Sequence, residues 1–227
     1  MMTDMLIGGQ LLKGEGVSVT VHNPSSGEVA ATFAGASLDQ FKAAIASARA
    51  AADKGEWAAL DPTERVDVIR RFLALLVEQT DRLKSLIVLE TGAPAGGFII
   101  EAQVAGPLSQ IAGMLDLYAK LPEIEENPLT LDERIASSGG FVQSIRRYVP
   151  VGVVAAISAY NFPLHISLWK LMTALVTGNC VVLRPSPLTP LTTLALGEAA
   201  REGDLLDRDV TVQEGVVGEP DLAIPPD

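Results

Sequence analysis

The chain has 227 residues, of which 48% are hydrophobic, and its formal net charge is -11 at pH 7. The hydrophobic content supports a packed core and argues against general disorder. The acidic balance argues against nucleic acid as a partner, because phosphate binding requires clustered Lys and Arg. A single cysteine excludes an internal disulfide and a multi-cysteine metal cluster, so we expect no metal site.

The start of the chain, MMTDMLIGGQ, has neither a basic region nor a long apolar run of the kind found in secretion signals. The apolar stretches around 151–157 and 171–176 are too short to span a bilayer. We therefore expect a cytoplasmic protein that has no membrane partner.

The first part of the chain predicts a hairpin followed by helices. Residues 17–21 and 29–33 alternate apolar and polar side chains on either side of turn residues at 23–27. Ser37 and Gln40 form a capping-box pattern before a helix. The apolar face predicted for this helix comprises Leu38, Phe41, Ile45, Ala48 and Ala52.

Two further helices are expected before residue 92. Asp61, Pro62 and Glu64 mark the start of the first, whose predicted core face is Val66, Ile69, Leu73 and Leu76. Thr80 is predicted to cap the second, which ends near Gly92.

The next stretch divides into a helix, a connector and a strand. Residues 98–121 have helical periodicity, with a kink or break expected at Gly106-Pro107. Residues 122–138 are acidic and weakly patterned, which is typical of an irregular connector. Residues 139–148 alternate as a strand does.

The segment from 150 to 190 predicts a βαβ unit. Residues 151–157 form an apolar, β-branched run typical of a strand buried on both faces of a parallel sheet. Pro163 fits the first turn of the following helix, and Gly178 fits its C-terminal cap. Residues 180–183 predict the second strand, and 210–212 are compatible with a third. Since ligands bind beyond the carboxyl ends of parallel strands, the loops after 157 and 183 predict a nucleotide site.

Five short motifs in this order resemble the aldehyde dehydrogenase superfamily, between about Val21 and Arg201. They are NPSSGE from Asn23, ETGAP from Glu90, NFP from Asn161 with Trp169-Lys170 after it, TGN from Thr177 and LRPS from Leu183. The resemblance implies an α/β fold with an incomplete Rossmann-like parallel sheet and an α-rich N-terminal segment. It divides the chain into an N-terminal part of the nucleotide-binding domain (1–121), a connector with the start of an oligomerisation arm (122–148) and the βαβ core (149–227).

The same resemblance assigns candidate catalytic residues. Asn161 corresponds to the family's donor to the oxyanion formed during aldehyde oxidation, whereas periodicity alone favours a helix-capping or turn Asn at this position. Lys170 corresponds to a Lys implicated in proton movement; its alternative is a surface lysine whose stem packs on apolar neighbours.

It also implies that NAD or NADP is the cofactor. Ile157, Ser158, Ala159 and Tyr160 would lie along the nicotinamide side and contribute mostly backbone. Arg184 and Ser186 would line the adenosine ribose.

Arg184 replaces the family's usual Lys, and Pro187 stands where many NAD-dependent members have a Glu. Both differences favour tolerance of a 2′-phosphate, so NADP is a candidate cofactor as well as NAD. The alternative for Arg184 is a solvated cation at a strand end without a binding role.

Three other residues with reactive side chains are not expected to take part in catalysis or metal binding. Cys180 opens an apolar strand without a base nearby, so an inert core thiol is expected and not a nucleophile. His22 and His165 are too far apart in sequence to suggest a metal site or a triad, and His165 falls on an apolar helix face.

The family's nucleophilic Cys and water-activating Glu lie in G-Q-x-C and E-L-G-G segments, and neither motif occurs in this sequence. The sequence after Leu205 departs from the family pattern, with prolines at 225 and 226, so we expect a truncated or frameshifted N-terminal part of a dehydrogenase. Such a part has an aldehyde as its small-molecule substrate and a homo-oligomer as its full-length state, and it needs a complementing C-terminal polypeptide for turnover. The alternatives are a non-catalytic nucleotide-binding or oligomerising fragment and a relic without biochemical function.

Overall fold

A five-stranded mixed sheet forms the centre of the structure, a computed structural model that describes residues 3–203 and 210–212. In spatial order its strands are β2 (Gln10–Leu12), β1 (Met5–Ile7), β9 (Val210–Val212), β8 (Cys180–Arg184) and β7 (Val153–Ile157). Strands β9, β8 and β7 are parallel, while β1 is antiparallel to both β2 and β9. The predicted α/β class and the third strand at 210–212 are confirmed. The expected departure after Leu205 and the prolines at 225 and 226 lie outside the described residues.

The predicted βαβ unit is present, although its first strand begins at Val153 and not at 151, and its second extends to Arg184. Helix α6 (Pro163–Val176) connects β7 to β8, and the two strands pair in register from Val153–Cys180 to Ile157–Arg184. Pro163 occupies the first helical turn, and Gly178 follows the helix with a φ of 82°, a left-handed conformation that favours glycine.

Strand β7 differs from its prediction in burial. Only Ala156 is buried in β7, and the side chain of Ile157 is 61% exposed, whereas β8 is buried up to Leu183. The reason is position, because β7 lies at the edge of the described sheet and has a pairing partner on one side.

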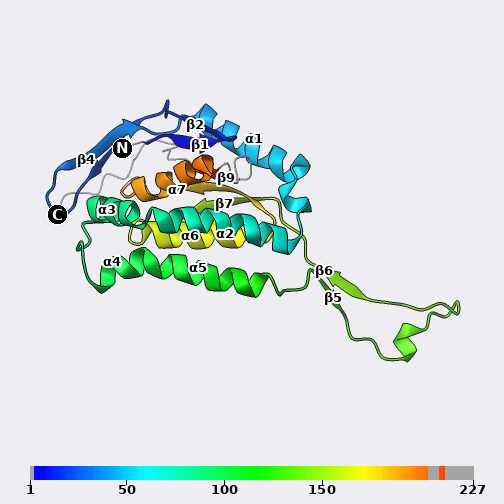
Figure 1. Ribbon diagram of the computed structural model, residues 1–227. Helices are drawn as coiled ribbons and strands as arrows, with labels where there is room; N and C mark the ends of the chain where they lie inside the picture. The colour runs from blue at the N-terminus through cyan, green and yellow to red at the C-terminus, as the bar shows by residue number, and fades with distance from the viewer. Residues whose placement is uncertain (1–2, 204–209, 213–227) are drawn as a thin grey trace, which may run out of the picture.

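Alternate residues of β8 face two different layers of helix. Cys180 and Val182 pack with Ala48 and Ala51 of α1 (Leu38–Lys54). On the other face of the sheet lie α6 and α7 (Leu191–Glu202), and α2 (Pro62–Glu78), α3 (Thr80–Thr91) and α5 (Ala105–Tyr118) form a further layer against them (Figure 1). The short helix η1 (Trp57–Ala59) joins α1 to α2.

The predicted apolar face of α1 is correct at Ala48 but wrong at Leu38 and Ile45. Leu38 and Ile45 are 51% and 44% exposed, and the buried residues are Gln40, Ala44, Ala48 and Ala51. Small alanine side chains allow close approach of the helix to the sheet. Gln40 is tolerated at the interface because its amide donates to the carbonyl of Lys13 at 2.8 Å while its Oε1 completes the capping box with Ser37.

The capping boxes at Ser37 and Asp61 and the core face of α2 are confirmed. The predicted cap at Thr80 is wrong, because Gln79 is the N-cap of α3 and the Thr80 hydroxyl donates to the carbonyl of Val77 at 2.6 Å. Helix α3 ends at Gly92, as expected, in a left-handed conformation.

The break expected at Gly106-Pro107 falls at Val104, between α4 (Phe98–Gln103) and α5. Within the described ranges, the 21-residue stretch Phe98–Tyr118 contains an 18-residue window with a mean hydropathy of 1.2, so it is long and apolar enough to cross a membrane by length and composition alone. Its apolar side is in the core, however, where Ile100, Leu108 and Ile111 are buried. This burial is typical of the core helix of a globular fold.

The sequence analysis missed one hairpin and correctly predicted another. Strands β1 and β2 are joined by Gly8 and Gly9, both with positive φ, which is the signature of a tight hairpin turn. The predicted hairpin of β3 (Ser18–His22) and β4 (Val29–Ala34) is confirmed.

Residues 122–148 extend away from the body as an arm (Figure 1). The expected irregular connector contains β5 (Ile124–Glu126), which pairs with β6 (Ile145–Arg147); β6 is the only regular strand in the predicted run 139–148 among the described residues. The short helix η2 (Asp132–Arg134) lies in the connection. The exposed apolar side chains of the arm are Ile124, Leu131, Ile135, Phe141, Val142, Ile145 and Tyr148.

Candidate functional site

The loops at the carboxyl ends of β7 and β8 lie side by side. The backbone N–H of Ser158 donates to the carbonyl of Arg184 at 3.0 Å, which extends the ladder by one bond beyond the paired strands. The Thr189 hydroxyl donates to the carbonyl of Tyr160 at 3.2 Å and joins the two loops at a second point. The structure therefore brings the predicted residues of both loops, 157–161 and 184–186, to one edge of the sheet.

The structure argues against the capping alternative for Asn161. The N-cap of α6 is Phe162, so Asn161 does not occupy the capping position, and a turn Asn remains the structural alternative. Asn161 itself is exposed. An exposed amide beside the positive end of a helix dipole is suited to stabilising a negatively charged oxygen.

The predicted nicotinamide-side residues divide into exposed and buried members. Ile157, Ala159 and Tyr160 are exposed. Ser158 is buried, and its Oγ accepts a hydrogen bond from Ser167 Oγ at 3.0 Å. Ser167 in turn is 2.9 Å from Thr193 Oγ1 on α7. The hydroxyl of Ser158 therefore binds within the core, and its backbone N–H is hydrogen-bonded to Arg184, so Ser158 holds the loop in place.

The loop after β8 is built as a tight turn. Ser186 Oγ accepts from the N–H of Leu188 at 3.3 Å, and the carbonyl of Ser186 accepts from the N–H of Thr189 at 3.1 Å. Arg184, Ser186 and Pro187 are half-buried at this edge. Arg184 is the last residue of β8 and Ser186 lies in the turn that follows, the segment that the sequence predicted to meet a ribose.

Lys170 is not brought to these loops. It is an exposed residue of α6, and seven residues of helix separate it from Pro163, about 10 Å along the axis. Its neighbour Trp169 donates from Nε1 to Gln110 Oε1 at 3.3 Å.

Cys180 is a buried core residue, as the sequence predicted. Cys180 is buried against α1 at the amino end of β8, opposite to the candidate site. His165 makes an edge-to-face contact with Phe162, their ring centroids 6.2 Å apart. No group of His, Cys, Asp and Glu suited to a metal occurs among the described residues.

The structure shows a contact at Glu90 that the sequence analysis did not anticipate. The Glu90 carboxylate accepts hydrogen bonds from the N–H of Leu191 at 2.6 Å, the N–H of Thr192 at 3.1 Å and the Thr192 hydroxyl. Burial raises the pKa of Glu90 to about 7, and the hydrogen bonds from Thr192 and Leu191 oppose this rise. A carboxylate on the apolar stripe of α3, in line with Leu83 and Ile87, was the available sequence signal. Because this carboxylate occupies the N-terminus of α7, that helix end does not suit an anionic ligand.

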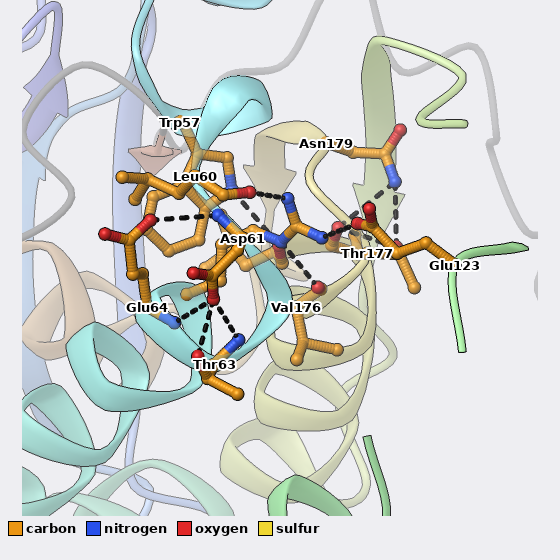
Figure 2. Close-up of polar contacts among 12 residues, drawn as sticks. Trp57, Leu60, Asp61, Thr63, Glu64, Glu123, Val176, Thr177 and Asn179 are labelled. Atoms are coloured by element: carbon orange, nitrogen blue, oxygen red, sulfur yellow. Dashed lines mark hydrogen bonds and ion pairs between the residues drawn. The ribbon is translucent and has the colours of Figure 1, made fainter. Parts of the chain in front are cut away.

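The TGN motif lies at the other end of α6 and is structural (Figure 2). Asn179 donates from Nδ2 to the carbonyl of Ala174 at 3.1 Å and accepts at Oδ1 from the N–H of Gly152 at 3.0 Å. Trp57 Nε1 donates to the carbonyl of Leu175 at 3.1 Å, and the buried Arg65 donates from Nε to the carbonyl of Val176 at 3.0 Å and from Nη2 to Glu123 at 2.9 Å. These bonds attach η1, α2 and the base of the arm to the end of α6.

Taken together, the parallel strands, the helix that connects β7 to β8 and the paired loops at the carboxyl ends of these strands define a Rossmann-like α/β fold. The chain matches the aldehyde dehydrogenase family over residues 12–217, and it belongs to that family. The match continues past Leu205, so the resemblance does not end where the sequence analysis placed the departure.

Solved structures give the same result. An aldehyde dehydrogenase of Mycobacterium tuberculosis complexed with NAD+ is 34% identical, with a TM-score of 0.80 over 94% of this chain and 42% of that chain. The indole-3-acetaldehyde dehydrogenase AldA of P. syringae, in complex with NAD+ and IAA, is 30% identical, with a TM-score of 0.83 over 95% of this chain and 41% of that chain. The present chain thus spans less than half the length of these relatives and corresponds to the N-terminal portion of the family's fold.

Proposed function

We propose that this chain is the nucleotide-binding front part of an aldehyde dehydrogenase that oxidises an aldehyde to a carboxylic acid with NAD or NADP. The observation that carries the proposal is the exposed segment 159–161, which lies at the carboxyl end of β7 and precedes a helix without a side-chain cap. Family membership and the NAD+ bound to two of the matched structures support it.

The residues present fit a nicotinamide dinucleotide, since exposed residues follow β7 and a cation ends β8. When bound, this cofactor supplies the hydride acceptor for aldehyde oxidation. Asn161 donates a hydrogen bond to the oxygen that becomes negatively charged when a thiolate adds to the aldehyde carbon, and the positive end of α6 stabilises the same charge. The thiolate and the water-activating carboxylate are supplied by another polypeptide segment, because this sequence contains neither a G-Q-x-C nor an E-L-G-G motif.

The test is a complementation assay. Alone, the chain is expected to produce no NAD(P)H from an aldehyde. Addition of a polypeptide that carries the G-Q-x-C and E-L-G-G segments of a related dehydrogenase is expected to restore turnover, with Asn161→Asp and Asn161→Ala as impaired variants. If the isolated chain binds neither NAD+ nor NADP+ and no complementing polypeptide produces turnover, the proposal is wrong.

Cofactor choice is tested at Arg184. The guanidinium suits a 2′-phosphate, and Pro187 provides no carboxylate that would repel it. Arg184→Met is expected to weaken NADP+ binding more than NAD+ binding, by about tenfold against about twofold. Equal losses for the two nucleotides would show that Arg184 does not meet the 2′-phosphate.

The arm formed by β5 and β6 supports a homo-oligomer as the state of the complete enzyme. Its exposed apolar side chains include Phe141, which is 95% exposed, and surfaces of this kind mark association sites. Phe141→Asp is expected to shift the molar mass measured by light scattering toward the monomer, with no change in the circular dichroism spectrum.

A second candidate function is favoured by the missing catalytic motifs. A chain that binds nucleotide and associates through its arm, without ever being complemented, would be a binding module. Nucleotide binding combined with a persistent lack of turnover in the complementation assay would favour this alternative.

A further inference from the structure

Glu90 is far from the candidate site in sequence, but it contacts the N-terminus of α7, which adjoins the loop after β8. Glu90 is 2% exposed, and its carboxylate accepts hydrogen bonds from Leu191 and Thr192 in the first turn of α7. The N-cap of α7 is Pro190, and no side chain at that position caps the helix. The first turn of α7 therefore takes its side-chain cap from another helix.

That first turn supports both candidate loops. Thr189, the residue before Pro190, donates to the carbonyl of Tyr160, and Thr193 is hydrogen-bonded through Ser167 to Ser158. The Thr189 N–H also closes the Ser186 turn. A displacement of the α7 N-terminus would consequently move the segment 158–160, which precedes Asn161, and the turn at Ser186 that follows β8.

The position of Glu90 is set in turn by the hairpin of β3 and β4. Gly92, which ends α3, has a φ of 67°, and a Cβ at this position would lie 2.8 Å from Pro24 Cγ and from Ser25 Oγ. Ser25 Oγ also donates to the carbonyl of Gly92 at 3.2 Å. The two upstream motifs, around Asn23 and Glu90, are therefore in contact and hold the carboxylate against α7.

We propose that Glu90 is a positioning residue for nucleotide binding: it fixes the α7 N-terminus, and through it the loops at 158–161 and 184–189, without touching the ligand. This inference rests on the proposed function, because it requires that these loops bind a nucleotide. It predicts that loss of the carboxylate weakens binding beyond what a general loss of stability would cause.

The experiment compares two buried carboxylates on the same pair of helices. Glu90→Gln removes one acceptor at the N-terminus of α7. Glu198→Gln is the matched control, since Glu198 is buried on α7, pairs with Arg82 of α3 and lies further along the helix from the loops. Dissociation constants for NAD+ and NADP+ are measured by titration calorimetry at mildly alkaline pH, well below the melting temperature of either variant.

We expect Glu90→Gln to weaken nucleotide binding about tenfold and Glu198→Gln less than about twofold, while both lower the melting temperature. Equal binding losses in the two variants, or unchanged binding in Glu90→Gln, would overturn the inference while the proposed function stands. If the wild-type chain binds no nucleotide, the proposed function fails and this inference fails with it.

A second variant keeps the test decisive if Glu90→Gln does not fold. Thr192→Val retains the carboxylate and both backbone donors but deletes the hydroxyl that binds Glu90. It is expected to weaken nucleotide binding about threefold. Wild-type affinity in a folded Thr192→Val protein would overturn the inference in that case.

Discussion

The two ends of α6 carry similar polar motifs but differ in how those motifs are used. At the C-terminal end, Asn179 and Thr177 are hydrogen-bonded within the protein. Arg65 and Trp57 donate hydrogen bonds to the backbone carbonyls there (Figure 2). At the N-terminal end, Asn161 is exposed and the helix has no side-chain cap. Polar groups that the fold does not satisfy are available to a ligand, so the comparison separates a structural motif from a candidate catalytic one.

The largest expected loss of stability is at the C-terminal end of α6, called the closed end because its polar groups are hydrogen-bonded within the protein; the N-terminal end is called the open end. Arg65→Met removes the donor to the carbonyls of Val176 and Leu60 and to Glu123, and it should lower the free energy of unfolding by about 4 kcal/mol. Denaturant titration measures this loss. Arg70→Met is the control, because Arg70 makes exposed ion pairs with Asp67 and Asp116 and should cost less than about 1 kcal/mol. Similar costs for the two variants would show that the closed end is not held by Arg65.

At the open end the effect should appear in catalysis. Asn161→Ala is expected to lower kcat of the complemented enzyme by about 100-fold or more, close to 3 kcal/mol, because one donor to the oxyanion is lost. Its free energy of unfolding should change by less than about 0.5 kcal/mol, because an exposed residue that caps no helix contributes little to stability. A stability loss comparable to that of Asn179→Ala would contradict the comparison.

The contribution of Glu90 to the stability of the fold should depend on pH. The pKa of Glu90 is raised from 4.5 to about 7 in the folded chain. A raised carboxyl pKa means that the folded state binds more protons than the unfolded state between these two values. The stability due to this group is therefore fully present below pH 4.5, falls as pH rises toward 7 and is constant above it.

The predicted change is about 3 kcal/mol between those limits. Denaturant unfolding of the wild-type chain and of Glu90→Gln, compared at several pH values, measures it. The wild-type advantage should shrink as pH rises. A difference that grows with pH would mean that the hydrogen bonds at the α7 N-terminus outweigh burial at Glu90.

The smallest of these effects is expected at Asn179. Asn179→Ala removes one of the donors to the carbonyl of Ala174 and the side-chain acceptor of the Gly152 N–H, and it should cost about 2 kcal/mol of unfolding free energy. Nucleotide affinity should remain within about twofold of the wild-type value, since this end of α6 lies away from the loops. A large loss of affinity would show that the two ends are coupled through the helix.

Several elements were predictable because their signals are local. Pro163 at a helix start, Gly178 after a helix end and the capping boxes at Ser37 and Asp61 act within one turn of chain. The Gly8-Gly9 turn carried an equally local signal that the sequence analysis did not use. The face of α1 was not predictable from apolar spacing, because close packing on the sheet selected alanines over Leu38 and Ile45.

By itself, the sequence determined the βαβ unit, the order of the motifs and the membership of the family, since these depend on residue type and on spacing along the chain. Only the tertiary structure decided that Asn161 is exposed and uncapped, that Asn179 is structural, and that Glu90 binds the α7 N-terminus. The physical reason is that hydrogen-bond satisfaction and burial depend on partners from distant parts of the chain, which spacing in the sequence does not record.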